Sequence, residues 1–358
     1  MDPGRLIPYP DILPAPWSFF HILLVITFFL HILMANTMLG TGIVLLVKNI
    51  HGRGSAEKDI SREIGDKLPM SIAFTVNLGV APLLFLQVTY GQFIYVSSVL
   101  MAVYWVSIFL LIILAYYSAY IYKFGYESLG MMRALPVGLS VILLLVVGFF
   151  FTNSTLLMID PKAWPQYFQN PNGTIIHTGE PSLIPRYLHF VVSSVAIGGL
   201  VFSIFGWFKK RRGEAEMDEL EKNGLLVYGF STMSQFVIGA WYLGTLPNYI
   251  VGSLFFESHF VFPIFLFSIV AALASIFFSF GRRLWHTVIS CVATIFLMVL
   301  FRFAVRSGYL DSYIASSRPE VISQFGAFMM FLIALIIGII TVIYMLKLAL
   351  RAGKEHVA

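Results

Sequence analysis

The stretch WSFFHILLVITFFLHILMANTMLGTGIVLLVK (residues 17–48) carries no charged side chain before its last residue. A helix needs about 20 apolar residues to cross the hydrocarbon core of a bilayer, because each residue adds about 1.5 Å. The stretch therefore predicts a membrane-spanning helix. Eight further apolar stretches predict spans near residues 68–89, 95–123, 134–156, 184–208, 224–246, 255–280, 284–306 and 323–350.

The composition of the chain indicates the same fold class. Of its 358 residues, 58% are apolar and only 11% are charged, whereas soluble domains carry about 25% charged residues. Too few polar side chains are present to cover a water-soluble fold of this length. This excludes a soluble enzyme, a nucleic-acid-binding protein and a disordered scaffold. We expect an all-α integral membrane protein, a bundle of nine transmembrane helices with the lipid bilayer as its partner.

Lysine and arginine are distributed unevenly between the predicted loops. The loops after the first, third, fifth and seventh spans and the segment after the ninth hold 17 of the 23 cations. Cytoplasmic loops are enriched in these residues, so the N-terminus is predicted outside and the C-terminus in the cytoplasm. The chain then divides into an outer segment 1–16, a membrane domain 17–350 and a cytoplasmic tail 351–358. We expect a cytoplasmic loop at 209–223 and an ordered outer loop, not a helix, at 157–183.

Ionisable side chains inside spans are costly, so each is a candidate functional residue. None of the 18 aspartates and glutamates lies at the centre of a predicted span, which argues against a proton-coupled transporter. A neutral imidazole in a membrane helix can bind haem iron. Five histidines fall in or at predicted spans, namely His21, His31, His189, His259 and His286.

The predicted depths of the histidines decide which of them could share one iron. His189 and His259 each lie about four or five residues into a span that starts outside, so both imidazoles are expected at one depth. Such a pair can bind one haem from both faces; the alternative is that both are structural. His31 is predicted near the middle of the membrane. His21 precedes His31 by about 15 Å along the helix, so these two cannot share an iron.

Three arginines are predicted at the outer level of His189. Arg186, Arg302 and Arg306 could neutralise the propionates of a haem there. The alternative is that their side chains extend to the membrane interface.

These features resemble subunit I of the cytochrome bd quinol oxidases. His31 is followed by Gly40 nine residues later (HILMANTMLG), and His189 by Gly198 in RYLHFVVSSVAIGG, similar to the two haem-ligating histidines of that family. The stretches that begin with LGVA at Leu78 and NSTLLMIDP at residue 153 are also similar. The resemblance covers residues 17–310 and implies nine spans, an outer N-terminus and the cytoplasmic membrane of a prokaryote.

The chain departs from the family at three places. The family pairs its fifth-span histidine with a methionine of the seventh span, and here FFESH puts His259 at that position. This implies a bis-His haem b with no open coordination site. The glutamates that the family's oxygen-reducing haems need in the third and eighth spans are missing, and the long outer quinol loop is reduced to Thr245–Leu254. The chain keeps ligands for electron transfer and lacks groups for oxygen reduction.

We therefore expect a membrane-bound b-type cytochrome of a respiratory chain, which transfers electrons between membrane quinol and an outer carrier. That carrier would be a c-type cytochrome, or another respiratory subunit, docked on residues 157–183. Haem b would be bound by His189 and His259, and a second haem at His31 remains open, with Met298 and His21 as further candidate ligands. The alternatives are a bd-type terminal quinol:oxygen oxidoreductase subunit, a haem-free membrane anchor subunit of a respiratory complex, and a transporter.

Overall fold

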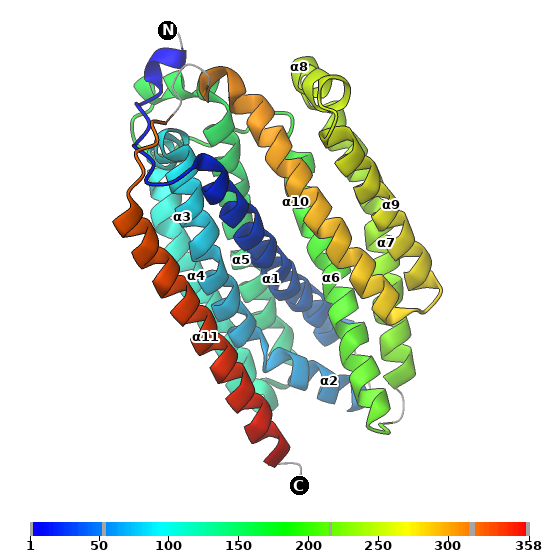
Figure 1. The fold of residues 1–358 in the computed structure, drawn as a ribbon. Helices are drawn as coiled ribbons and strands as arrows, with labels where there is room; N and C mark the ends of the chain where they lie inside the picture. Colours follow the sequence, from blue (N-terminus) through cyan, green and yellow to red (C-terminus); the bar gives the residue numbers. More distant parts are fainter. Residues whose placement is uncertain (1–2, 52–54, 215–216, 315–318, 356–358) are drawn as a thin grey trace.

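The computed structural model describes residues 3–51, 55–214, 217–314 and 319–355. Its long helices run side by side, with α8 at one end of the bundle and α2 at the other (Figure 1). We call these the α8 end and the α2 end. The long helices are α1 (Trp17–His51), α3 (Leu68–Leu100), α4 (Ala102–Leu129), α5 (Ala134–Ile159), α6 (Leu183–Arg211), α7 (Met217–Gly244), α9 (Val261–Phe280), α10 (Leu284–Ile314) and α11 (Phe325–Glu355). The short elements are η1 (Pro3–Leu6), α2 (Ser55–Gly65), η2 (Gly130–Arg133), η3 (Pro161–Phe168), α8 (Asn248–Gly252) and η4 (Ser253–Glu257).

Seven stretches of the described residues are long and apolar enough to cross a membrane. One of them, Ala102–Ile159, contains both α4 and α5. Large apolar side chains such as Phe109 and Phe124 are exposed on the surface of α4. A surface of this kind is stable in lipid, where a helix satisfies its own backbone hydrogen bonds. The predicted all-α membrane protein is confirmed at this level.

The boundary between the second and third predicted spans is wrong. The sequence suggested a turn between residues 89 and 95, but α3 continues to Leu100 and α4 begins at Ala102. Only a kink lies at the expected place, where Tyr90 has non-helical backbone angles (φ −135°, ψ 32°). The stretch does not form a loop because Tyr90 and Phe93 are fully buried in the core.

The predicted outer loop at 157–183 contains a helix, contrary to expectation. Asp160 accepts a hydrogen bond from the backbone N–H of Lys162 (3.3 Å) and so caps η3. The indole of Trp164 is buried in the core and donates to the carbonyl oxygen of Leu157 (2.7 Å). The segment is therefore ordered, as the sequence suggested. Its order comes from the buried Trp164 and the cap at Asp160, which the pattern of Pro and Gly residues did not predict.

The predicted cytoplasmic loop at 209–223 is mostly helical as well. Helix α6 extends to Arg211, and α7 already begins at Met217. The ammonium group of Lys209 forms ion pairs with Glu63 (2.7 Å) and Glu214 (3.0 Å), which ties this connection to α2.

Some residues used in the sequence analysis lie outside the described part of the chain. They include Arg53 and Arg318 of the charge pattern and residues 356–358 of the predicted tail. The first residues of that tail continue α11, which runs to Glu355.

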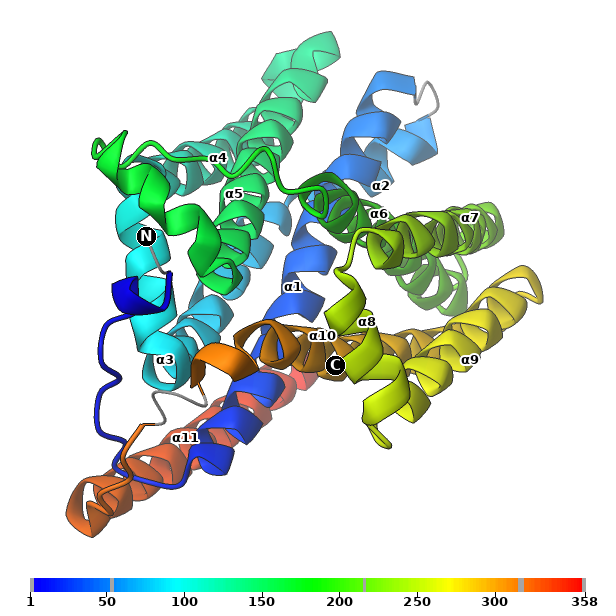
Figure 2. The same ribbon diagram turned by 90° about the horizontal axis from the view of Figure 1, so that it is seen from above.

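The backbones of α1 and α6 touch where they cross. A Cβ atom at Gly40 would lie 1.7 Å from the carbonyl oxygen of Ser194, and one at Gly198 would lie 2.3 Å from the carbonyl oxygen of Gly40. The hydroxyl of Ser194 donates to Oδ1 of Asn36 at the same crossing (2.8 Å). Small residues and interhelical hydrogen bonds hold membrane helices together, since lipid offers no hydrophobic driving force. This crossing sets α1 among the other helices (Figure 2).

Replacement of Gly40 by alanine should destabilise the protein by about 2 kcal/mol or more, because the methyl group has no room against the backbone of α6. Gly338→Ala is the matched control, since a Cβ at this α11 position meets nothing within 4 Å. Thermal unfolding in detergent micelles measures the difference. Equal melting temperatures for the two variants would contradict the close contact between α1 and α6.

Candidate functional site

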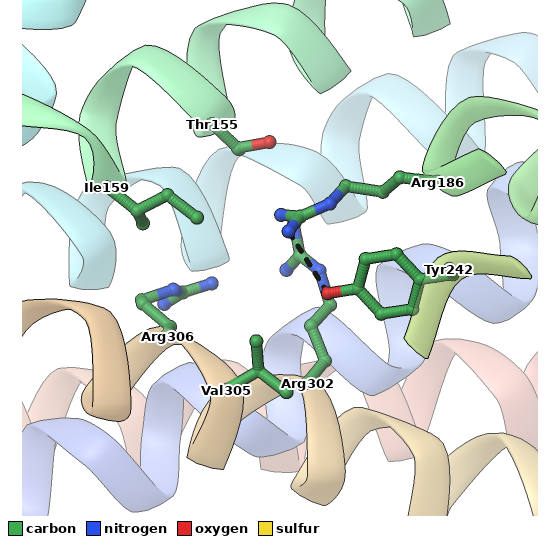
Figure 3. Close-up of a pocket in the computed structure, with 7 residues that line it drawn as sticks. All are labelled: Thr155, Ile159, Arg186, Tyr242, Arg302, Val305 and Arg306. Atoms are coloured by element: carbon green, nitrogen blue, oxygen red, sulfur yellow. Dashed lines mark hydrogen bonds between the residues drawn. The ribbon is translucent and has the colours of Figure 1, made fainter. Parts of the chain in front are cut away.

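Three arginines meet at a small cavity in the half of the bundle near the α8 end. Arg186 comes from α6, and Arg302 and Arg306 come from α10 (Figure 3). The cavity has a volume of about 20 Å³, enough for about one water molecule. Its remaining lining residues are Thr155, Ile159, Tyr242 and Val305.

Each guanidinium group lies near an aromatic ring. Arg186 donates through Nη2 to the hydroxyl of Tyr242 (3.0 Å). Arg302 lies over the ring of Phe28, 4.5 Å from its centroid, and Arg306 lies 5.4 Å from the centroid of Tyr90. Cation–π contacts of this kind offset part of the cost of burying a charge.

The arginines have no acidic partner among the described residues. None of the residues that line the cavity is acidic, and none of the ion pairs involves Arg186, Arg302 or Arg306. The Nε of Arg186 and the Nη1 of Arg306 are buried without a hydrogen-bond partner. Buried charges are normally paired, because an isolated one costs several kcal/mol or more. The arrangement therefore suits an anionic group.

His189 lies one helical turn from Arg186 on α6, towards the α2 end. The two are three residues apart, which places them on neighbouring positions of one helix face. The ring of His189 lies against α7, where a Cβ at Gly239 would be 3.7 Å from its Cε1. Its Nδ1 is buried and has no hydrogen-bond partner in the described structure. The site thus combines a cationic cluster with an uncommitted imidazole.

His259 does not lie in the seventh long apolar helix. Helix α9 begins at Val261, and the backbone N–H of Val261 donates to the hydroxyl of Ser258 (3.2 Å). Ser258 itself is extended (φ −93°, ψ 110°) after the π-helical turn η4. Because this cap starts the helix after His259, the side chain is exposed in a turn. The expected position inside the helix is wrong, and the described residues show no pair of histidines placed to bind haem.

His31 lies at the contact between α1 and α3. Its Nδ1 donates to the carbonyl oxygen of Thr75 (3.1 Å), which fixes the tautomer and leaves Nε2 as the basic nitrogen. The absence of a side chain at Gly79 makes room for the ring, since a Cβ there would lie 2.8 Å from Cε1 of His31. Gly79 of the LGVA stretch is therefore explained by the space that the ring of His31 needs.

Met298, the further candidate ligand at His31, lies on α10. On α10, the residues Leu284, Cys291 and Ile295 pack against α6 and α7, and helical spacing puts Met298 on the same face. The face of α10 that meets α1 carries Phe296, which contacts Phe29 (5.4 Å between ring centroids).

His21 lies beside the arginine cluster. Its ring stacks on Tyr90, the residue under Arg306, with 5.6 Å between centroids. Its Nε2 is buried and has no hydrogen-bond partner among the described residues. His21 and His31 therefore face different neighbours, in agreement with the inference that they cannot share one iron.

The sequence analysis missed one cluster of ligating side chains. Asp160, His177 and Glu180 come together in the segment between α5 and α6. The only sequence signal is that the three residues fall within one predicted outer loop.

Comparison with models of protein families finds no match to the chain, and comparison with curated proteins finds none either.

Replacement of Gly79 by alanine should displace the ring of His31 and break its hydrogen bond to Thr75, at a cost of about 1 kcal/mol or more. In a His31→Ala background the same replacement should cost little, because the obstructing ring is gone. Thermal unfolding of the two single variants and the double variant measures this coupling. Additive effects would show that His31 does not occupy the space at Gly79.

Proposed function

We propose that the chain is a membrane-bound b-type cytochrome, similar to subunit I of the cytochrome bd oxidases. It would transfer electrons between membrane quinol and a carrier on the outer side of a prokaryotic cytoplasmic membrane. In this proposal the bundle spans the membrane nine times with the α8 end outside and the C-terminus in the cytoplasm. A c-type cytochrome or another respiratory subunit would dock on the ordered segment around η3.

The observation that carries the proposal is the cluster of three arginines without a carboxylate, one helical turn from His189. Haem b carries two propionates and an iron that accepts an axial imidazole. The cluster offers the positive charge that two propionates need, and His189 offers a buried ring nitrogen without a partner. When bound, haem supplies reversible one-electron transfer at its iron.

The residues match haem in their chemistry, while the cavity is closed by their own side chains. A cavity of about 20 Å³ holds about one water molecule, so binding requires Arg186, Arg302 and Tyr242 to move apart. This movement would part Tyr242 from the core cluster that it shares with Phe301 and Val305. The core cluster that joins α6 to α10 is confined to residues 196–207 and 284–295, on the side of the α2 end.

The proposal assigns His189 as an axial ligand and keeps His31 as the ligand of a possible second haem. The exposed turn at His259 gives no support for the bis-His pair. Oxygen reduction is disfavoured because no glutamate is available in the third and eighth apolar stretches.

The test is a reduced-minus-oxidised absorption spectrum of the purified protein, with a pyridine haemochrome assay and addition of carbon monoxide. We expect a low-spin haem b that carbon monoxide does not change, which requires a second axial ligand from this chain in addition to His189. His189→Ala should abolish this signal, whereas His259→Ala and His31→Ala should leave it intact.

Other outcomes would point to other functions. A component that binds carbon monoxide would favour the terminal oxidase. A protein without haem would refute the cytochrome and favour a membrane anchor subunit. Loss of the signal in His259→Ala would restore the bis-His pair.

The arginines should raise the reduction potential of the haem, since reduction adds a negative charge near them. Arg302→Met should therefore lower the midpoint potential by about 70 mV, as expected for a unit charge about 10 Å away at an effective dielectric constant of about 20. Arg283→Met, at an exposed position near the α2 end, is the control. Redox titration measures both variants, and an unchanged potential in Arg302→Met would place the haem elsewhere.

A further inference from the structure

The segment between α5 and α6 brings three ligating side chains together at the α8 end. The Nε2 of His177 lies 3.0 Å from Oδ2 of Asp160 and 3.9 Å from Oε2 of Glu180. All three ligand atoms lie within 4.8 Å of one another. The side chains are largely buried, with exposed fractions of 12% for His177, 27% for Asp160 and 22% for Glu180.

Backbone hydrogen bonds hold the three side chains in this arrangement. Asp160 uses Oδ1 to accept from the N–H of Lys162 (3.3 Å), which leaves Oδ2 towards His177. Glu180 uses Oε1 in the same way, accepting from the N–H of Ser182 (3.3 Å). The N–H of His177 donates to Oδ1 of Asn153, a fully buried residue of α5 (3.0 Å). One oxygen of each carboxylate and one nitrogen of the imidazole are thus directed to a common point.

The charge of the cluster is not balanced within the described structure. No lysine or arginine there forms an ion pair with Asp160 or Glu180. A neutral imidazole can donate a single hydrogen bond from Nε2, so it cannot satisfy both carboxylates. A divalent cation would balance both charges at once.

We propose that Asp160, His177 and Glu180 bind a divalent first-row transition cation, with water completing its coordination. One imidazole nitrogen and two carboxylate oxygens are ligands of Zn²⁺. Donor atoms about 2.0–2.1 Å from a tetrahedral Zn²⁺ are about 3.3 Å apart, which lies between the two distances from His177, 3.0 Å to Asp160 and 3.9 Å to Glu180. The site would join the end of α5 to the start of α6 across η3 (Figure 1). It is independent of the proposed electron transfer.

The proposal is tested by zinc binding to the full-length protein, purified through a tag without histidine and stripped with EDTA. Equilibrium dialysis against ZnCl₂ with elemental analysis should give one tightly bound Zn²⁺ per chain. His177→Ala and Asp160→Asn should each weaken this binding at least about 100-fold. His51→Ala is the matched control, because this exposed histidine forms a hydrogen bond within its own helix, to the carbonyl oxygen of Val47 (3.1 Å).

Two results would overturn the proposal. The first is that the wild-type protein binds no zinc tightly, which would leave an ordinary histidine–aspartate hydrogen bond. The second is unchanged zinc affinity in both site variants. If His177→Ala does not fold, Asp160→Asn and Glu180→Gln decide, because they keep the shape of each side chain and remove its charge. The haem spectrum of these variants should match that of the wild type, so the two proposals fail independently.

Discussion

The close contact between α1 and α6 is the constraint on which the rest of the bundle depends. The carbonyl groups of Gly40 and Ser194 lie where any side chain at Gly40 or Gly198 would collide with them. In lipid, two apolar helices gain little by hiding their surfaces from each other, so close backbone packing supplies the specificity. The hydrogen bond between Ser194 and Asn36 fixes the rotation of both helices at this point. Once α1 is fixed against α6, its other faces contact α3 and α10.

The other faces of α1 position His31 and the surroundings of the arginine cluster. One face of α1 turns His31 to α3, where Thr75 and Gly79 receive its ring. Another turns Phe28 to α10, where it lies under Arg302. Helix α6 contributes Arg186, which lines the same cavity as Arg302. The glycines that follow His31 and His189 after nine residues thus belong to one crossing, and they position the surroundings of both histidines without touching either ring.

The sequence predicted the membrane fold, because apolar length is a local property of the chain. It also placed Arg186 near Arg302 and Arg306, since depth along a span can be counted from its ends. It failed at His259, where the start of α9 depends on the cap at Ser258 and the π-helical turn before it. The cluster of Asp160, His177 and Glu180 was missed because its geometry arises from three separate backbone hydrogen bonds.

The structure keeps opposite charges apart where the chain brings them close. Asp160 directly follows Ile159, which lines the arginine cavity, and Glu180 precedes Arg186 by only six residues. Ion pairs between them would remove the cost of three buried cations, yet both carboxylates are held towards His177 by backbone N–H groups. Such separation costs stability, because neither cluster has an ion-pair partner of opposite charge among the described residues. The separation is explained if an anionic group binds the three arginines and a cation binds Asp160, His177 and Glu180. Each cluster then has its charge balanced by its own ligand, and both sites remain available.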